Sequence, residues 1–251
     1  MRIRSLFFFF IIFNSFFSNG QKAVDSLCEI DKSHHFTYKK LIAPSALITL
    51  GSITAFSKSH DLDLKIKNYS QSHFATQTGF DDYLQYLPAT SVYALNFASI
   101  KGKHGFMDRS ILFLSSQMIT GAIVFPIKYL SHQQRPNQSN YHSFPSGHTA
   151  LSFSGAHFLF REYRDKNIWL ALSGYPVALA VGALRISNNK HWFSDVMAGA
   201  GIGILSTELA YWAFPSVKKV LHIGWNQNRI DGILLPNIGW NHFGLSWYMS
   251  F

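Results

Sequence analysis

Two polar stretches lie between apolar segments of the sequence. Residues 128–148 read KYLSHQQRPNQSNYHSFPSGH, and residues 185–195 read RISNNKHWFSD. Each stretch begins where an apolar segment of helical length ends, and each leads into another such segment. We therefore expect the basic and histidine side chains of both stretches to lie at helix ends on the same side of a helical bundle.

Apolar segments recur on both sides of these stretches. Most have the length of a helix and contain glycine, alanine or serine, which allow helices to pack closely, and no long alternating strand pattern appears among them. They cover residues 41–57, 83–100, 109–127, 149–160, 168–184 and 196–214. The sequence thus predicts an all-α fold, a membrane-associated bundle of about six apolar helices.

The composition supports an envelope protein. Hydrophobic residues make up 47% of the 251 residues and charged residues 14%, whereas soluble proteins average roughly 25% charged residues. The net charge of +9 suits an anionic partner such as a phospholipid surface or a phosphorylated substrate, or simply basic residues that flank membrane helices. The sequence contains neither a basic helix nor an aromatic–basic sheet pattern, so it does not indicate a nucleic-acid partner.

The N-terminal residues resemble an export signal. Arg2 and Arg4 precede an apolar run at 6–17, and the small residues at 18–20 would allow cleavage before Gln21. We therefore predict a signal peptide at 1–20. An uncleaved anchor is the alternative, although the apolar run is short for a full membrane span.

The remaining chain is divided by composition. A polar N-terminal segment at 21–40 precedes the helical domain at 41–214, and a C-terminal tail covers 215–251. Glycine, asparagine and proline punctuate short aromatic runs in the tail, which favours an irregular segment or a small hairpin. Cys28 is the only cysteine, so the chain can form neither an internal disulfide nor a cysteine metal cluster.

The polar stretches contain groups suited to hold a phosphoryl group. In phosphoryl transfer, negative charge on the phosphoryl oxygens is stabilised mainly by positioned cations and hydrogen-bond donors. Arg135 and Arg185 can each donate in a bidentate manner, and Lys128 supplies a point charge. Ser146 and Gly147 begin a helix whose first N–H groups form an anion site, and glycine allows a phosphate to approach the backbone.

Two histidines can divide the chemistry between them. A nucleophilic histidine needs a carboxylate to fix its tautomer and orientation, and Asp195 is spaced to serve His191. His191 is therefore the predicted nucleophile, and His148 is the predicted acid that protonates the leaving oxygen.

Each cluster alone also has a structural explanation. Basic residues at a helix end can neutralise its carbonyl groups, Ser146 can cap a helix, and His191 and Asp195 can be an ordinary helical i,i+4 pair. Their occurrence together at helix ends favours a shared site.

The combined pattern resembles the type 2 phosphatidic acid phosphatase (PAP2) and vanadium haloperoxidase superfamily, with its signature K-x6-RP, PSGH and SR-x5-H-x3-D. The matching residues are Lys128, Arg135 and Pro136, then 145–148, then Arg185, His191 and Asp195. Leu184 stands where the family has serine, so one polar contact with phosphate is missing from the pattern. The resemblance implies a helical bundle, the roles given above, and neither a metal nor another cofactor.

The predicted function is hydrolysis of a lipid phosphate monoester, or of a polyprenyl or lipid pyrophosphate, through a phosphohistidine intermediate at the outer face of a membrane. A soluble periplasmic nonspecific acid phosphatase is the first alternative. A vanadium haloperoxidase and a nonenzymatic protein that binds lipid phosphates are the others, and binding alone would not require both histidines and Asp195. The sequence leaves the oligomeric state open.

Basic flanks give the orientation. Basic residues at 101–109 and 161–166 are predicted to be cytoplasmic, which places the polar stretches on the periplasmic side of a bacterial envelope. A cleaved signal followed by three full spans would place them inside, so the sequence predicts fewer than six spans.

Overall fold

The computed structural model describes residues 37–57, 60–75, 77–223, 231–239 and 242–250. All of them belong to one unit, Phe36–Phe251. The signal peptide predicted at 1–20 and most of the polar segment at 21–40 lie outside the described residues.

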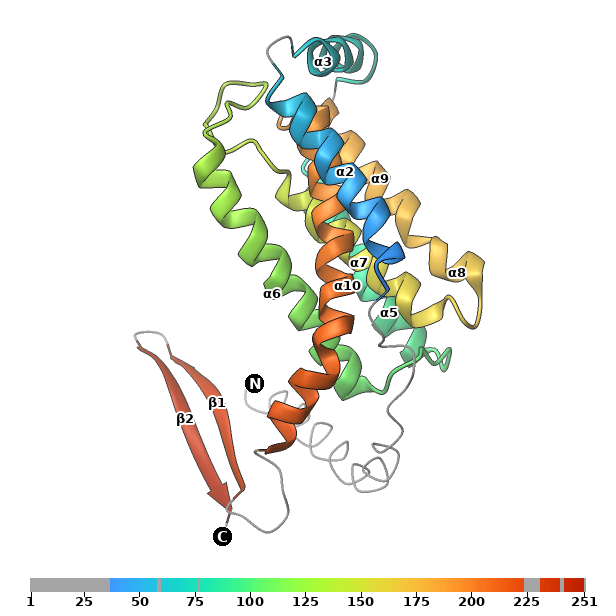
Figure 1. The fold of residues 1–251 in the computed structure, drawn as a ribbon, viewed down its shortest axis with the longest axis vertical. Helices are drawn as coiled ribbons and strands as arrows, with labels where there is room; N and C mark the ends of the chain where they lie inside the picture. Colours follow the sequence, from blue (N-terminus) through green and yellow to red (C-terminus); the bar gives the residue numbers. More distant parts are fainter. Residues whose placement is uncertain (1–36, 58–59, 76, 224–230, 240–241, 251) are drawn as a thin grey trace, which may run out of the picture. The chain divides into compact units, whose positions relative to one another are not determined.

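The described core is helical, and the tail forms a hairpin (Figure 1). The predicted all-α fold class is thereby confirmed, and of the two forms predicted for the tail, irregular or hairpin, the structure has the hairpin. The antiparallel hairpin pairs Asp231 with Ser250 and Gly239 with His242. In chain order, the elements are α2 (Lys39–Ala55), α3 (Asp61–Phe74), α4 (Phe80–Leu84), α5 (Leu87–Phe97), α6 (Phe106–Ser131), α7 (Gly147–Tyr163), α8 (Ile168–Leu172), α9 (Gly174–Ser187), α10 (Phe193–Ile223), β1 (Asp231–Gly239) and β2 (His242–Ser250).

Helix α10 packs against α2, α6 and α7. Glycines on two of its faces allow this close packing. A Cβ atom on Gly199 would lie 2.5 Å from the carbonyl oxygen of Ser146 in α7's N-cap, and one on Gly201 would lie 2.6 Å from the carbonyl oxygen of Pro44 in α2. Small residues at these positions let the helix backbones approach each other, as they do in membrane bundles.

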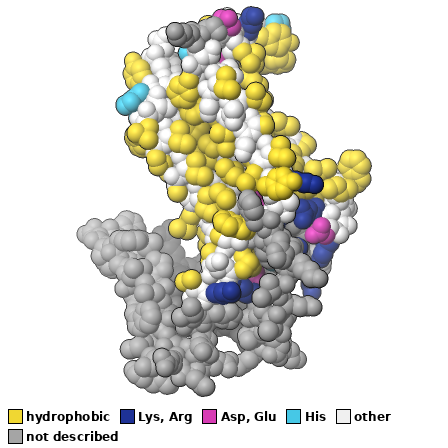
Figure 2. All heavy atoms as spheres, in the orientation of Figure 1, with side chains coloured by type: hydrophobic (Ala, Val, Ile, Leu, Met, Phe, Trp, Pro, Cys, Tyr) yellow, Lys and Arg dark blue, Asp and Glu magenta, His cyan; other side chains and the backbone are white. Residues whose placement is uncertain are grey.

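Two helical segments are long and apolar enough to cross a membrane among the residues that the structure describes. They are α6 and the combined segment of α8 and α9, Ile168–Ser187. Large hydrophobic side chains on α6 face outward, including Leu114, Met118 and Phe125. Figure 2 shows hydrophobic side chains over much of the visible face of the helical part. These exposed side chains suit a lipid environment.

Three elements differ from the sequence prediction. Helix α3 was not predicted, because its sequence DLDLKIKNYSQSHF is mostly polar. The apolar stretch at 83–100 is not one helix: α4 ends at Leu84, and α5 begins at Leu87 with Pro88 in its first turn, a favourable place for proline. Helix α10 continues beyond residue 214 to Ile223.

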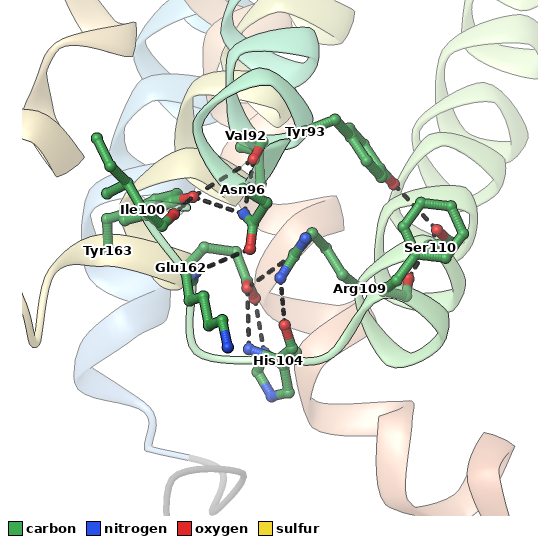
Figure 3. A network of polar contacts seen from close by, with 12 residues as sticks. Val92, Tyr93, Asn96, Ile100, His104, Arg109, Ser110, Glu162 and Tyr163 are labelled. Atoms are coloured by element: carbon green, nitrogen blue, oxygen red, sulfur yellow. Dashed lines mark hydrogen bonds and ion pairs between the residues drawn. The ribbon is translucent and has the colours of Figure 1, made fainter. Parts of the chain in front are cut away.

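A buried polar network lies at the C-terminal end of α7, away from the two polar stretches (Figure 3). The carboxylate of Glu162 lies 2.6 Å from Nδ1 of His104 and 3.4 Å from Nε of Arg109, and it accepts a 2.7 Å hydrogen bond from the Tyr211 hydroxyl. These contacts tie α7 to α10, to α6 and to the loop before α6.

Glu208 of α10 is the centre of a second group of polar contacts with α7. One of its carboxylate oxygens lies 2.7 Å from Nε2 of His157, and the other accepts a hydrogen bond from the Arg161 guanidinium. Nδ1 of His157 lies 2.6 Å from the Tyr175 hydroxyl of α9. His157 therefore joins three helices, as expected of a structural histidine.

Candidate active site

The loop from α6 to α7 and the loop from α9 to α10 carry the predicted site residues. Lys128, in the last turn of α6, donates hydrogen bonds to the carbonyl oxygens of His142, Ser143 and Pro145 at 3.0, 3.3 and 2.8 Å. All three ammonium protons can be satisfied in this way. Lys128 thus holds the loop that leads into α7, a structural task that its sequence position did not reveal.

Ser146 and Gly147 begin α7 as predicted. Ser146 is the N-cap residue, but its hydroxyl contacts Thr149 Oγ1 at 2.9 Å and makes no capping bond to the helix backbone. A Cβ atom on Gly147 would lie 3.8 Å from Lys128 Cε, which is an ordinary contact. Packing within the described protein therefore does not by itself demand glycine at position 147.

His191 and Asp195 are in direct contact. Nδ1 of His191 lies 3.2 Å from Oδ2 of Asp195, and both side chains are buried. The same oxygen accepts hydrogen bonds from the Trp192 N–H at 2.8 Å and from the Ser143 hydroxyl. If Nδ1 carries the proton, its hydrogen bond to Asp195 fixes this tautomer. The lone pair of the ring then lies on Nε2, the nitrogen that does not contact Asp195.

Charge at this site favours a neutral imidazole. Burial lowers the pKa of His191 well below its ordinary value, and the cations of Lys128, Arg185 and Arg135 act in the same direction. His148 also contributes. These four side chains therefore lie close enough to His191 to influence the pKa of its ring.

The pKa of Asp195 shifts in the opposite direction from that of His191. Burial raises the pKa of its carboxyl group to about 6, although the hydrogen bonds from Ser143 and the Trp192 amide oppose the shift. At neutral pH, the pair therefore consists mainly of a neutral His191 and an ionised Asp195, the protonation states that a histidine nucleophile needs.

Both arginines of the pattern present a buried donor. Within the described part of the chain, Nε of Arg135 and Nε of Arg185 are buried and have no hydrogen-bond partner. Nη1 of Arg185 bonds to the carboxylate of Asp81, which also accepts a 2.9 Å hydrogen bond from Asn188. An unpaired buried donor is costly, so both guanidinium groups are suited to meet an acceptor from a ligand.

Two acidic residues of α4 that the sequence motifs do not include also contact the site. Nε2 of His148 lies 2.8 Å from Oδ1 of Asp82, and Nη1 of Arg185 lies 3.5 Å from the same oxygen. Two adjacent acids, Asp81 and Asp82, in a chain with 13 acidic residues were the available signal. Their partners are too distant in sequence for spacing to reveal the contacts.

Helix α3 is also bound to the site loops. Asp63 is buried and accepts hydrogen bonds from the Ser194 N–H at 2.9 Å and from its hydroxyl at 2.6 Å, so it caps the start of α10. Lys67 donates to the carbonyl oxygen of Pro136 at 3.0 Å and lies 5.2 Å from the centre of the Trp192 ring. These contacts connect α3 to both polar stretches.

The sequence and its helical geometry are similar to those of known proteins. A family model of the PAP2 superfamily matches residues 110–219, a range that contains every predicted site residue. The match covers 110 of the 251 residues and confirms the predicted resemblance to the PAP2 superfamily. The membrane-associated helical fold agrees with this resemblance. Among the residues that the structure describes, no group of three histidine, cysteine or acidic side chains is arranged to hold a metal ion.

Two curated proteins are similar in sequence to this chain. Lipid A 1-phosphatase of Porphyromonas gingivalis is 35% identical over 136 residues, which are 54% of this chain and 31% of that protein. The bacitracin transport permease protein BcrC of Bacillus licheniformis is 39% identical over 95 residues, 38% of this chain and 45% of that protein. The matched region thus spans less than half of either relative.

A solved structure is also similar. The PAP2-type phosphatidylglycerolphosphate phosphatase of Bacillus subtilis aligns with a TM-score of 0.49 at 19% identity, over 77% of this chain and all of that one.

Proposed function

We propose that this PAP2 protein hydrolyses a lipid phosphate monoester, or a lipid or polyprenyl pyrophosphate, through a phosphohistidine formed on His191. The observation that carries the proposal is the buried His191–Asp195 pair with its 3.2 Å contact. The charges of Lys128, Arg135 and Arg185 act on the ring of His191 and lower its pKa. Such a site combines a neutral nucleophile with positive charge for the oxygens of a phosphoryl group.

The phosphoryl group would be held mainly by three sources of hydrogen bonds. The unpaired Nε groups of Arg135 and Arg185 supply two of them. The third is the start of α7, where the first amides of a helix have no partner within the helix. Packing within the protein does not require glycine at position 147. Close approach of a phosphate to the backbone there would explain why this residue is glycine.

In the first chemical step, Nε2 of His191 attacks phosphorus and the bond from phosphorus to the leaving oxygen breaks. His148 gives its proton to that oxygen, and Asp195 stabilises the positive charge that develops on the His191 ring. In the second step, water attacks the phosphohistidine and His148 accepts a proton from it. Inorganic phosphate leaves, and both histidines return to their starting protonation states.

A lipid substrate suits the surface of the protein. Large hydrophobic side chains are exposed on α6, and α6 and α8–α9 are long and apolar enough to lie in a bilayer. The name of the Porphyromonas gingivalis relative also specifies a lipid phosphate substrate. A phosphatase embedded in a bilayer meets lipid headgroups at the depth of its helix ends, where this site lies.

The test is the activity of the purified full-length protein in lipid vesicles against three substrates: a phosphatidic acid, a polyprenyl pyrophosphate and a water-soluble phosphate monoester. The proposal expects phosphate release from at least one lipid and loss of this release in His191→Ala. Hydrolysis of the soluble ester alone would favour the nonspecific acid phosphatase, and no release from any substrate would contradict an enzymatic role.

We also propose that the site faces the periplasm, because the basic residues near 101–109 and 161–166 lie at the other end of α6 and α7. In a Cys28→Ser background, Ser139→Cys places a thiol in the exposed loop before α7, and Asp165→Cys places one at the exposed opposite end. In intact spheroplasts, a membrane-impermeant maleimide should label position 139 and spare position 165. The reverse pattern would exclude this orientation, and release of the protein by alkaline carbonate would exclude integral membrane association.

A further inference from the structure

Helix α4 presents two neighbouring carboxylates with different surroundings. Asp81 is fully buried and bonded to Arg185 and Asn188. The Asp82 side chain is 50% exposed, and its Oδ1 lies 2.8 Å from Nε2 of His148. Asp81 therefore serves as the main counter-ion of Arg185, whereas the carboxylate of Asp82 lies closer to His148 than to Arg185.

We propose that Asp82 is a positioning residue that holds His148 in the orientation and protonation state of the acid. This inference rests on the function proposed above. The carboxylate accepts the Nε2 proton, so Nδ1 of the protonated ring is the nitrogen that gives its proton to the leaving oxygen. Asp195 holds the other histidine, His191, through Nδ1. The two histidines are thus each held by a carboxylate, but at opposite ring nitrogens.

The charges around His148 show why such a partner is needed. Burial lowers the pKa of His148, and the guanidinium of Arg185 on α9 acts in the same direction. The carboxylates of Asp82 and Asp81 on α4 raise it, Asp82 through both a hydrogen bond and its charge. His191, before α10, is a further titratable group coupled to the ring. An acid must carry its proton at the working pH, so Asp82 offsets part of the effect of burial and of Arg185.

The decisive variant is Asp82→Asn in the full-length protein, because asparagine retains an acceptor oxygen and removes the charge. Rates are measured against pH for two soluble phosphate monoesters, one with an alkyl alcohol and one with 4-nitrophenol as the leaving group. We expect the basic limb of the kcat profile to move to lower pH. At neutral pH, the alkyl ester should lose about ten-fold or more and the nitrophenyl ester much less, since a good leaving group needs little help from an acid.

Two further variants complete the test. Asp82→Glu restores the charge and should move the basic limb back towards that of the wild type. Asp61→Asn removes an exposed carboxylate from the first turn of α3 and should leave both profiles unchanged. A thermal unfolding midpoint for each variant shows whether a loss of rate reflects loss of fold.

An unmoved basic limb in Asp82→Asn, with equal losses for both esters, would overturn the inference and make Asp82 a structural residue. Tighter inhibition of Asp82→Asn by vanadate, with no shift of the basic limb, would also overturn the inference. It would show that the carboxylate of Asp82 in the wild type competes with the phosphate for Arg185. The variant His148→Ala distinguishes failure of the inference about Asp82 from failure of the proposed function. Equal losses for both esters in that variant would remove His148 from the role of acid, whatever Asp82 does.

Discussion

The backbone N–H of Ser146 donates a 3.0 Å hydrogen bond to the backbone carbonyl oxygen of Asp195. This bond joins the start of α7, which carries His148, to the first turn of α10, which carries Asp195. One turn further along α10, Gly199 lies against the carbonyl oxygen of the same Ser146. The separation of the acid from the nucleophile pair is therefore set by contact between two helix backbones.

Gly199→Ala should impair catalysis by separating these helices. The added Cβ would lie 2.5 Å from a backbone oxygen that no side-chain rotation can move. We expect a loss of kcat on the order of 100-fold, the effect of a displacement of about 1 Å at a reacting site, and a cost of about 1–3 kcal/mol in stability. Gly121→Ala on α6 is the control, since its Cβ would meet only the Phe125 side chain, at 3.4 Å. Similar kinetics for the two variants would contradict this view.

His191→Ala should abolish turnover, and rapid quenching of the wild type should trap phosphate on His191. His148→Ala should retain the phosphohistidine but form it slowly, with a loss of about 10²–10⁴-fold for alkyl leaving groups and a smaller loss for nitrophenol. Trapped phosphate on any other residue would disprove the assignment of the nucleophile.

Ser143→Ala should move the acidic limb of the kcat/KM profile to higher pH. Burial raises the pKa of Asp195 to about 6, and the Ser143 hydroxyl is the strongest of the groups that oppose this rise. Without that hydroxyl, the carboxyl group gains its proton at a higher pH, and the neutral acid no longer supports His191. The rate should then fall from a higher pH as the solution is made more acidic. An acidic limb that stays in place would show that Asp195 does not control it.

Activity should survive EDTA, and vanadate should inhibit competitively. Lys128, Arg135, Arg185 and the start of α7 already provide positive charge for the phosphoryl group, and vanadate can imitate its five-coordinate transition state. Both effects are measured as steady-state rates with a soluble ester. A loss of activity in EDTA that a divalent ion restores would show that a metal takes part.

Glu208→Gln should destabilise the fold far more than it affects catalysis. The change leaves the buried Arg161 guanidinium without its carboxylate partner, at the end of α7 remote from His148. Breaking a buried ion pair costs about 3–5 kcal/mol. Denaturant titration in detergent should show this loss, and the double variant Glu208→Gln/Arg161→Met should recover part of it. An Asp165→Asn control removes an exposed carboxylate and should change little.

Local sequence was sufficient to predict the framework and the ends of the helices that carry the site. Long apolar runs with small residues identify α2, α6, α7, α9 and α10. Both the length of such a helix and the small residues that let it pack closely are found within its own segment of the sequence. Ser146 and His191 follow from the same logic, since a helix start and an i,i+4 spacing are local features.

The second layer of the site could not be predicted in this way. Asp82 meets His148 from 66 residues away, and Asp63 meets Ser194 from 131 residues away. Such contacts depend on how the helices pack. Lys128 shows the same limit, because its position in the sequence indicates a cation but not the three loop carbonyls that its ammonium group binds.

The division of the site between two parts of the chain has a consequence for its evolution. The groups proposed to hold and cleave the phosphoryl group come from 128–195, whereas the acids and the lysine that cover them come from 61–84. Substitutions in α4 can therefore alter the carboxylates that meet His148 and Arg185 without changing either of those residues. A descendant of such a chain could keep every residue of 128–195 and still differ in the pH dependence of its activity.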